Sequence, residues 1–531
     1  MLTRYAPLAH KRKTFHILSS LSSHTSQTHK RKTAMRKYHR FLSTSASATC
    51  SRTEAGSILF LSPTLWPEPS SSAAGVRTTN LLQNFASTPS LFDSVHYGSG
   101  APKPSTLTEY AHLHSLSTHH GIKLHDVPAN KSDIMQDMLS DLPNLRAVLF
   151  DRYFAEEAYS FHFHRWKPNV LRILDMQDFH ALRLARQDMV ETSSKNDYGD
   201  WMNDALMDRL MACIPAHGDG MRDELQHHTT RKRKKGKNAS DILLRELTSI
   251  HRSDLTLVCS MEEFDILTEV FNIDPGKLIL APFFSEENAI SYESPAHQFD
   301  QRKDFTVLGG LRHPPNVDSI KWLKSEIWPK ILDQIPDAKV HIWGSYAPQH
   351  IMELNDPTRG FCVYGKLDSL CQELSTRRVL LAPLRYGAGI KGKIVDAWEH
   401  GCPVVTTPIG AEGTTMSRDL KSCTVRSGQN TIDDTGWGGL VGTEADTIAR
   451  CAVRLYNDHS LWNEARNNAR RLMRIKFNKE KNLAVVNNAI EEALLNRTQR
   501  RSKDHISSLL WHQSMRATEY FSRWIELKEK K

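Results

Sequence analysis

Three glycines and two lysines lie close together in the segment GAGIKGK, residues 387–393. Gly387, Gly389 and Gly392 carry no side chain, so a ligand can approach the backbone closely there. Lys391 and Lys393 add positive charge to the same segment. Free backbone amides and ammonium groups both bind anions, so this segment could bind a phosphate group.

The flanking sequence predicts the elements that position this segment. The runs 379–383 and 403–407 are short and apolar, which predicts two buried parallel strands. Between them, residues 390–400 have helical spacing, and Gly401 is a typical C-terminal cap. The N-terminus of this helix would add its dipole to the phosphate site. The alternative is a plain βαβ unit that binds no ligand.

The string from 379 to 414 resembles the nucleotide-sugar loop of family 4 glycosyltransferases of GT-B fold. That family has a strand ending in Pro-Leu, a Gly-x-Gly loop, a helix that carries an acid, and then G-x-P-V-V-T-T. The resemblance implies that Asp396, where the family usually has Glu, hydrogen-bonds the ribose. It also implies that the amides after Gly389, beginning with Ile390, bind the diphosphate. Many members carry a second acid, aimed at the donor sugar, where this chain has Ala388.

Two further segments of the second half resemble the same family. GGLRHPPN, at 309–316, matches its Gly-Gly-x-x-x-x-Pro-Asn element, and implies that Gly309 and Gly310 approach the donor diphosphate. Arg312 is a possible substitute for the Arg–Lys phosphate pair that is commoner in the family. Gly365 lies in the V-x-G-x-L element, whose backbone borders the nucleotide base in the family.

In the first half, the segment LDMQDFHALRLAR, 174–186, follows a predicted strand at 170–175. Polar residues beyond the carboxyl end of a strand lie where open α/β sheets bind ligands. The segment resembles the family's D-x-x-D-x-H-x-x-R element, which faces the cleft between the domains. The resemblance makes Asp178 and His180 the candidate catalytic residues, in contact with the acceptor or the donor. A local helix cap is the alternative.

The first loop of the chain offers another candidate contact at the cleft. Its pattern, P-x(11)-G-x-R, ends in Gly75 and Arg77 and resembles the family's first loop. There, a glycine lets the backbone approach the acceptor or the donor. The forked donors of Arg77 suit a phosphate. The alternative for Arg77 is a solvated arginine at the start of a helix.

These elements predict an α/β chain of GT-B fold, with two Rossmann-like domains that face each other across a cleft. A chain of 531 residues is long enough for two or three such domains. The predicted divisions are a basic leader at 1–55, an N-terminal acceptor domain at 56–284 with a basic insertion near 220–240, a linker at 285–303, a C-terminal nucleotide-sugar domain at 304–475, and C-terminal helices at 476–531 that cross back toward the first domain. Residues 496–531 fit no element of the family.

The net charge of +9 comes from the leader and not from the folded body. Residues 1–53 contain 11 Lys and Arg but no acid, which leaves 58 basic and 60 acidic residues in the rest. This argues against a nucleic-acid-binding protein. The leader has the composition of a mitochondrial or plastid transit peptide, the alternatives being a disordered extension and a cytoplasmic protein. The basic run at 231–237 has no interleaved aromatics, which favours a surface loop over an RNA-binding or nuclear-localisation segment.

The sequence gives no sign of a metal site, a disulfide framework or a membrane span. It has no D-x-D triplet, and its histidine doublets lack partners at ligand spacing, so no metal cofactor is expected. The eight cysteines form no CxxC pair. No run approaches 18 apolar residues, so no transmembrane segment is expected.

The resemblance implies a glycosyltransferase that moves a sugar from a UDP- or GDP-sugar to an acceptor, with retention and without a metal. The acceptor could be a glycan, a lipid or a small molecule. Ala388 and the incomplete Arg–Lys pair suggest the alternative, an inactive nucleotide-sugar-binding protein of the same fold. The sequence names neither the donor sugar and its base nor the acceptor.

Overall fold

The computed structural model describes residues 56–529 except 70–71, 104–106, 193–205, 207–209, 211–238, 287, 416–423 and 426–435. The leader and the basic run at 231–237 lie outside the described residues, so the interpretations given for them stay predictions. Among the described helices, none combines the length and the apolar character that crossing a bilayer requires.

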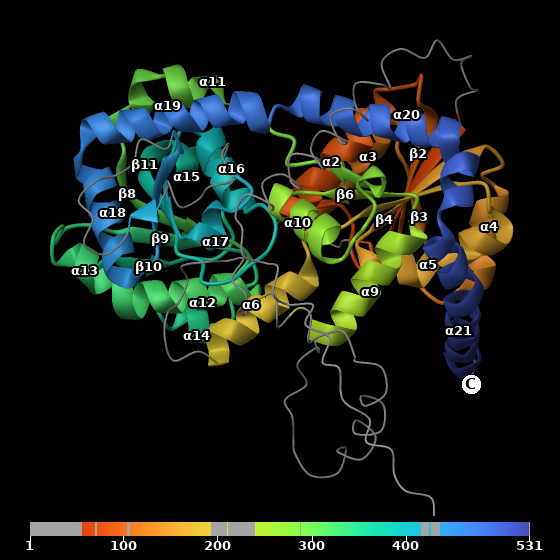
Figure 1. Cartoon of the computed structure of the whole chain (residues 1–531). Coiled ribbons are helices and arrows are strands. Elements are labelled where there is room, and N and C mark those ends of the chain that lie inside the picture. The colour runs from red at the N-terminus through yellow and green to blue at the C-terminus, as the bar shows by residue number, and fades with distance from the viewer. Residues whose placement is uncertain are drawn as a thin grey trace, which may run out of the picture. The chain divides into compact units, whose positions relative to one another are not determined.

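The first sheet has seven parallel strands in the order β3-β2-β1-β4-β5-β6-β7 (Figure 1). The strands are β1 (Gly56–Ser62), β2 (Phe92–Ser99), β3 (Lys123–Asp126), β4 (Leu145–Asp151), β5 (Leu171–Asp175), β6 (Leu255–Val258) and β7 (Leu278–Leu280). The helices that accompany them include α2 (Ala73–Ala86), α3 (Leu107–His120), α4 (Ser132–Ser140), α5 (Tyr153–Trp166), α6 (His180–Thr192), α9 (Ala239–Arg252) and α10 (Met261–Asp265).

The second sheet also has seven parallel strands, in the order β10-β9-β8-β11-β12-β14-β13. The strands are β8 (Lys303–Leu308), β9 (Val340–Trp343), β10 (Phe361–Val363), β11 (Arg377–Ala382), β12 (Val404–Thr406), β13 (Thr424–Val425) and β14 (Gly439–Gly442). The helices here are α12 (Pro314–Trp322), α13 (Trp328–Leu332), α14 (Gln349–Met352), α15 (Leu370–Thr376), α16 (Gly392–Glu399), α17 (Pro408–Ala411) and α18 (Ala445–Asn457).

The packing of strand β11 explains why its residues 379–382 are all apolar. Val379 and Leu381 belong to one hydrophobic cluster, whereas Leu380 and Ala382 belong to another. Successive side chains of a strand point to opposite faces, so both faces of this sheet are covered. Two such parallel sheets confirm the predicted α/β class with two Rossmann-like domains.

The chain ends in three long helices, α19 (His459–Lys476), α20 (Lys479–Lys503) and α21 (His505–Glu529). Leu472 of α19 packs in a core cluster of the second sheet, whereas Val486 and Ile490 of α20 pack in the core of the first. The last helix, dark blue and ending at the C label in Figure 1, contacts α5 and α9.

The segment predicted as a linker, 285–303, has more structure than its polar composition indicated. It contains the short helix α11 (Ala289–Glu293) and two 3₁₀ turns, Pro295–His297 and Phe299–Gln301. Arg302 fixes this segment, because its buried guanidinium donates to the carbonyl oxygens of Leu374 and His400 at 2.7 and 2.9 Å. A single buried arginine in a polar stretch gives no periodic signal, so the sequence pattern missed it.

Candidate active site

The loop between β11 and α16 lies against the polypeptide that follows β5. Gly389 has a φ of +63°, and a β-carbon there would stand 3.4 Å from the Asp178 β-carbon and from Glu263 Oε1. A larger residue would therefore meet both backbone strain and side chains. Two segments that the sequence picked out separately, 174–186 and 387–393, are thus neighbours in the structure.

Lys391 is the N-cap residue of α16 and is held by the loop that precedes it. Its Nζ donates to the Gly389 carbonyl oxygen and lies 3.6 Å from Glu412 Oε2. Burial lowers the pKa of Lys391, and Glu412 opposes part of that shift. This ammonium therefore already has an anionic partner within the protein.

Lys393 has a neutral partner instead. Its Nζ donates to Asn316 Oδ1 at 2.7 Å, and Asn316 Nδ2 donates to the Gly310 carbonyl oxygen at 3.0 Å. A β-carbon on Gly309 would lie 2.5 Å from Asn316 Nδ2 and 2.9 Å from Lys393 Nζ, so only glycine leaves room for this pair. Burial, together with the charge of Lys391, lowers the pKa of Lys393 to about 7.

Asp396 lies one turn beyond Lys393 on α16. Within the described part of the chain, no group donates a hydrogen bond to its carboxylate, although Lys393 attracts it electrostatically. Burial raises the pKa of Asp396 to about 7, and the charge of Glu399 also raises it. The N-terminal part of α16 thus carries a half-buried ammonium and, three residues later, an acid that accepts no hydrogen bond from the described part of the chain.

The glycines predicted to border the donor lie beside open space. A β-carbon on Gly310 or Gly365 would have no neighbour within 4 Å. The two positions lie near each other, because Gly344 donates to the Gly365 carbonyl oxygen at 3.0 Å and packs directly on the Gly309 carbonyl. Arg312, the proposed substitute for a phosphate-binding pair, has its guanidinium 4.9 Å from the ring centre of Tyr346.

Asp178 and His180 form a charged cluster at the start of α6. His180 Nδ1 lies 3.4 Å from Asp178 Oδ1 and 3.2 Å from Glu246 Oε1, and Arg183 Nε donates to Asp178 Oδ2 at 2.8 Å. Burial alone would raise the pKa of Asp178, but His180 and Arg183 outweigh it and the pKa is lowered. Burial alone would lower the pKa of His180, but Asp178 and Glu246 raise it above its usual value. The cluster therefore favours an ionised Asp178 and a protonated His180.

Glu246 is a member of this cluster that sequence reasoning missed. Its carboxylate accepts from the backbone amides of His180 and Ala181 at 2.9 and 2.8 Å, so it also caps α6. A signal was present, because Glu246 lies four residues after Ile242 and four before Ile250, on the apolar face of α9. An acid on such a face is buried and needs partners.

Glu263, which follows the strand β6, completes the cluster beside Gly389. Its Oε1 accepts from the Phe179 amide at 2.8 Å, and its Oε2 accepts from Ser260 Oγ at 3.0 Å. Burial raises the pKa of Glu263 to about 7. These bonds fix the chain at the start of α6 and thereby help to position Asp178 and His180.

A second missed pair, Arg186 and Glu412, joins α6 to the polypeptide after α17. Arg186 Nη1 and Nη2 donate to the two carboxylate oxygens of Glu412, both at 2.8 Å, and Nη1 also donates to the Gly387 carbonyl oxygen at 2.6 Å. The two side chains are only 4% and 0% exposed. The pair therefore ties the glycine loop of the second domain to a helix of the first.

Gly75 and Arg77 do not line an open surface. Arg77 is 0% exposed; its Nε donates to both Asp175 oxygens, at 3.1 and 2.9 Å, and its Nη1 donates to the Ala281 carbonyl oxygen at 2.6 Å. A β-carbon on Gly75 would lie 2.1 Å from the Glu68 carbonyl oxygen. Neither a phosphate contact nor a solvated arginine fits this position, because the guanidinium of Arg77 is paired with Asp175 and so joins α2 to β5. The motif identified an ion pair of the core.

Within the described residues, no group of three or more His, Cys, Asp or Glu side chains is arranged to hold a metal ion. The expectation that no metal is required stays a prediction.

Comparison by sequence links the second domain to a known family. Residues 302–458 match the model of the family "Glycosyl transferases group 1". This range contains Gly309, Lys393, Asp396 and Glu412. No curated protein matches the chain by sequence.

Comparison by structure extends to most of the chain. A glycosyltransferase from Rickettsia africae ESF-5 superposes with a TM-score of 0.53 at 11% identity, over 84% of this chain and 100% of that one. TarM from S. aureus, in a complex that contains UDP, gives 0.52 at 9% identity, over 82% and 99%. HepE from Anabaena, in complex with UDP-glucose, gives 0.50 at 12% identity, over 83% and 100%.

At these identities the structural similarity establishes the fold, and it confirms the predicted GT-B architecture. The sequence match supplies the chemical class of one domain. Residues 302–458 thus match the family of group 1 glycosyltransferases, within a chain of GT-B fold.

Proposed function

We propose that this protein transfers a sugar from a UDP- or GDP-sugar to an acceptor, as a retaining, metal-independent member of glycosyltransferase family 4. The observation that carries this proposal is the arrangement at the N-terminus of α16. Lys393 binds the neutral amide of Asn316, which in turn binds the open backbone at Gly310, and one turn further along α16 Asp396 accepts no hydrogen bond from a described residue. The family match of this domain supports it.

In this proposal the donor binds through its diphosphate and its ribose. Lys393, the amides after Gly389 and the α16 dipole neutralise the diphosphate. Asp396 accepts hydrogen bonds from the ribose hydroxyls, and the backbone at Gly365 borders the base. Arg312 is a further candidate for a phosphate contact.

The reaction forms a bond between the acceptor oxygen and the anomeric carbon, and it breaks the bond from that carbon to the phosphate oxygen. The nucleoside diphosphate leaves with the electron pair, and its phosphate oxygen takes the acceptor proton. Negative charge therefore grows on the diphosphate, where a fixed cation lowers the barrier most. Because its pKa is raised, His180 acts in this scheme as a hydrogen-bond donor to the sugar or the acceptor, held in place by Asp178.

His180→Ala is expected to lower kcat about 10- to 100-fold, the effect of losing one hydrogen bond from a charged group. The melting temperature should change little, because Glu246 would still accept from the two backbone amides at the start of α6. Steady-state kinetics and thermal unfolding of the same preparations check this. A large fall in melting temperature at unchanged specific activity would instead assign His180 to the helix cap.

Nucleoside diphosphate affinity is expected to be greatest near pH 7. Above about pH 7 Lys393 loses its proton and its attraction for phosphate, and below about pH 7 Asp396 gains a proton and accepts weaker hydrogen bonds from ribose. Lys393→Arg should remove the alkaline loss, because arginine stays charged, and Asp396→Asn should remove the acid loss. Calorimetric titration with UDP and GDP across pH 6–8 measures both. The site assignment fails if neither variant changes the profile.

A screen of UDP- and GDP-sugars for turnover, run with the full chain, tests the proposed activity. Ala388, which leaves the donor sugar without the carboxylate that many family members have, favours a second candidate function. In that case the protein would bind a nucleotide-sugar without transferring the sugar. Tight binding of a donor that is neither hydrolysed nor transferred would select this second function.

A further inference from the structure

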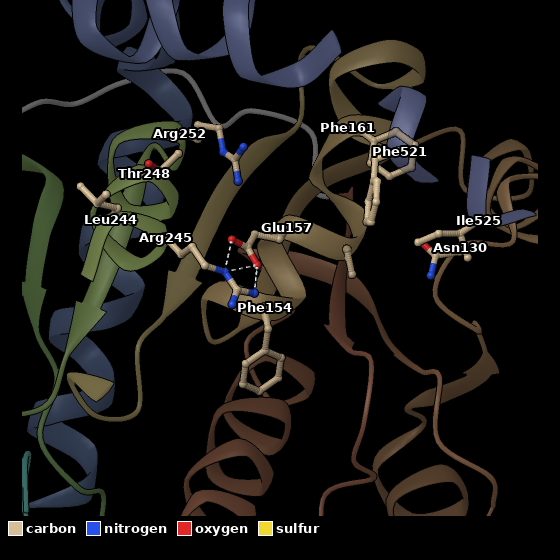
Figure 2. A pocket seen from close by; sticks show the side chains of 11 residues that line it. Asn130, Phe154, Glu157, Phe161, Leu244, Arg245, Thr248, Arg252, Phe521 and Ile525 are labelled. Carbon is tan, nitrogen blue, oxygen red and sulfur yellow. Dashed lines mark hydrogen bonds and ion pairs between the residues drawn. The ribbon is translucent and has the colours of Figure 1, made fainter. Parts of the chain in front are cut away.

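A pocket of about 730 Å³ lies between α5, α9 and α21 (Figure 2), and none of its lining residues belongs to the glycine loop. Its volume is within the range of about 300–1,000 Å³ that small-ligand sites occupy. Of these three helices, α21 belongs to the segment that matched no element of the family. The lining residues are Asn130, Phe154, Glu157, Ala158, Phe161, Leu244, Arg245, Thr248, Arg252, Phe521 and Ile525.

The chemistry of the lining favours an apolar ligand. Six of its side chains are aromatic or aliphatic: Phe154, Ala158, Phe161, Leu244, Phe521 and Ile525. Its charges are already neutralised in pairs. Arg245 binds Glu157 through three hydrogen bonds, drawn as dashed lines in Figure 2, and Arg252 forms an ion pair with buried Glu156. The pocket thus offers apolar surface, and its charged side chains already have partners of opposite charge within the protein.

One layer of aromatic rings separates this pocket from His180. Phe154 lines the pocket, and its ring centre lies 6.5 Å from that of His180. Tyr153 contacts both His180 and the pocket residue Arg245. Its ring centre lies 5.4 Å from the ring centre of His180 and 4.9 Å from the guanidinium of Arg245. A ligand whose chain fills the pocket could therefore present a polar end near His180.

One side of α21 is docked firmly on the first domain. Trp511 stacks at 4.7 Å on His164 and lies 4.2 Å beneath the Arg172 guanidinium. Glu519 pairs with Arg165 at 2.6 Å, and Glu526 accepts from the Ser132 amide at 2.8 Å. The helix is therefore a fixed wall of the pocket.

The other side of α21 exposes large apolar side chains beside this wall. Tyr520, Phe521, Trp524 and Leu527 are each 55–67% exposed, and the ammonium of Lys528 lies 5.2 Å from the Trp524 ring. Residues at i, i+4 and i+7 share one helix face. An exposed face of aromatic and aliphatic residues with a cation is typical of a helix that lies in a membrane interface.

We propose that the pocket binds the aliphatic chain of a lipid acceptor, while the exposed face of α21 rests on the membrane from which that lipid comes. This inference rests on the proposed function, because it makes the lipid hydroxyl, placed near His180, the oxygen that receives the sugar. Phe521 belongs to both surfaces, lining the pocket and standing on the exposed face, so one continuous apolar path leads from the lipid surface to the pocket.

Chain binding is tested with a fluorescent amphiphile, 11-(dansylamino)undecanoic acid, and with analogues of shorter and longer chain. Affinity for the full-length protein should rise about fourfold per added methylene until the pocket is filled. Thr248→Trp, which fills the pocket, and Phe521→Ser, which removes an exposed lining group, should each weaken binding at least tenfold. Ile475→Ser is the matched control, because Ile475 is an exposed aliphatic residue of α19 outside the pocket, and it should bind as the wild type does.

Membrane binding is tested by flotation with vesicles of phosphatidylcholine and phosphatidylglycerol in equal amounts. The wild type and Ile475→Ser should float with the vesicles, whereas the double variant Trp524→Ser and Leu527→Ser should not. The proposal is overturned if affinity for the amphiphile does not depend on chain length, if the pocket variants bind it unchanged, or if the wild type fails to float. Amphiphile binding by Lys393→Ala, which is altered only at the donor site, separates a failure of this pocket from a failure of the proposed donor site.

Discussion

Lys393→Ala is expected to lower kcat by about 10²–10³-fold, which is the usual effect of removing one contact to charge that develops in the transition state. In the proposed reaction this charge is on the leaving diphosphate. Lys393 is the lysine best placed to meet it, because among the described residues the one hydrogen-bond partner of its Nζ is a neutral amide oxygen, that of Asn316. A phosphate can displace or share that contact without breaking an ion pair.

Lys391→Ala is the matched comparison and should have a much smaller effect on kcat. The ammonium of Lys391 is engaged by the Gly389 carbonyl and lies near Glu412, so it is less available to a phosphate. The two lysines lie only two residues apart in the same segment, so the sequence alone allowed either one to face the ligand. The partners of the two side chains make the distinction.

The melting temperature of Lys393→Ala should stay close to that of the wild type. Burial already disfavours the charged form of this lysine, and Asp396, the acid that it attracts, can take up a proton once the lysine is gone, because its pKa is already raised to about 7. Turnover with the best donor from the screen, the affinity for its nucleoside diphosphate, and thermal unfolding are measured together. Wild-type turnover in Lys393→Ala, or an equal loss in Lys391→Ala, would contradict this assignment.

The fold was largely predictable, because its signals are local. A short apolar run such as 379–383 or 403–407 predicts a buried strand from its own composition, and the structure has strands at Arg377–Ala382 and Val404–Thr406. The glycine loop, the helix after it and the strand that follows lie within 36 consecutive residues, 379–414. Neighbouring elements of an α/β fold are adjacent in sequence as well as in space.

Partnerships between distant residues were not predictable. Glu246 binds the start of α6 from 66 positions away, and Glu412 binds Arg186 from 226 positions away. A single sequence carries no record of which charges meet across such distances. The same limit explains Arg77, whose local motif suggested a ligand contact but whose partner, Asp175, lies 98 positions along the chain.

Arg186→Met is expected to lower the free energy of unfolding by about 3–5 kcal/mol, the usual cost of breaking a buried ion pair by removing one partner. The substitution leaves the Glu412 carboxylate fully buried with only Lys391, at 3.6 Å, to compensate it. It also removes the hydrogen bond to the Gly387 carbonyl, so the loop proposed to bind the diphosphate should loosen and donor affinity should fall. Denaturant unfolding midpoints and UDP or GDP titration measure the two effects.

The double variant Arg186→Met with Glu412→Leu separates the effect of the ion pair on stability from the effect of the Gly387 contact on donor affinity. It removes the stranded carboxylate, so most of the lost stability should return, as is common when a buried ion pair is replaced by apolar residues. Donor affinity should not return with it, because the hydrogen bond to Gly387 is still missing. Recovery of both properties would mean that Arg186 acts on the donor site only through Glu412. Recovery of neither would mean that the two side chains are not energetically coupled.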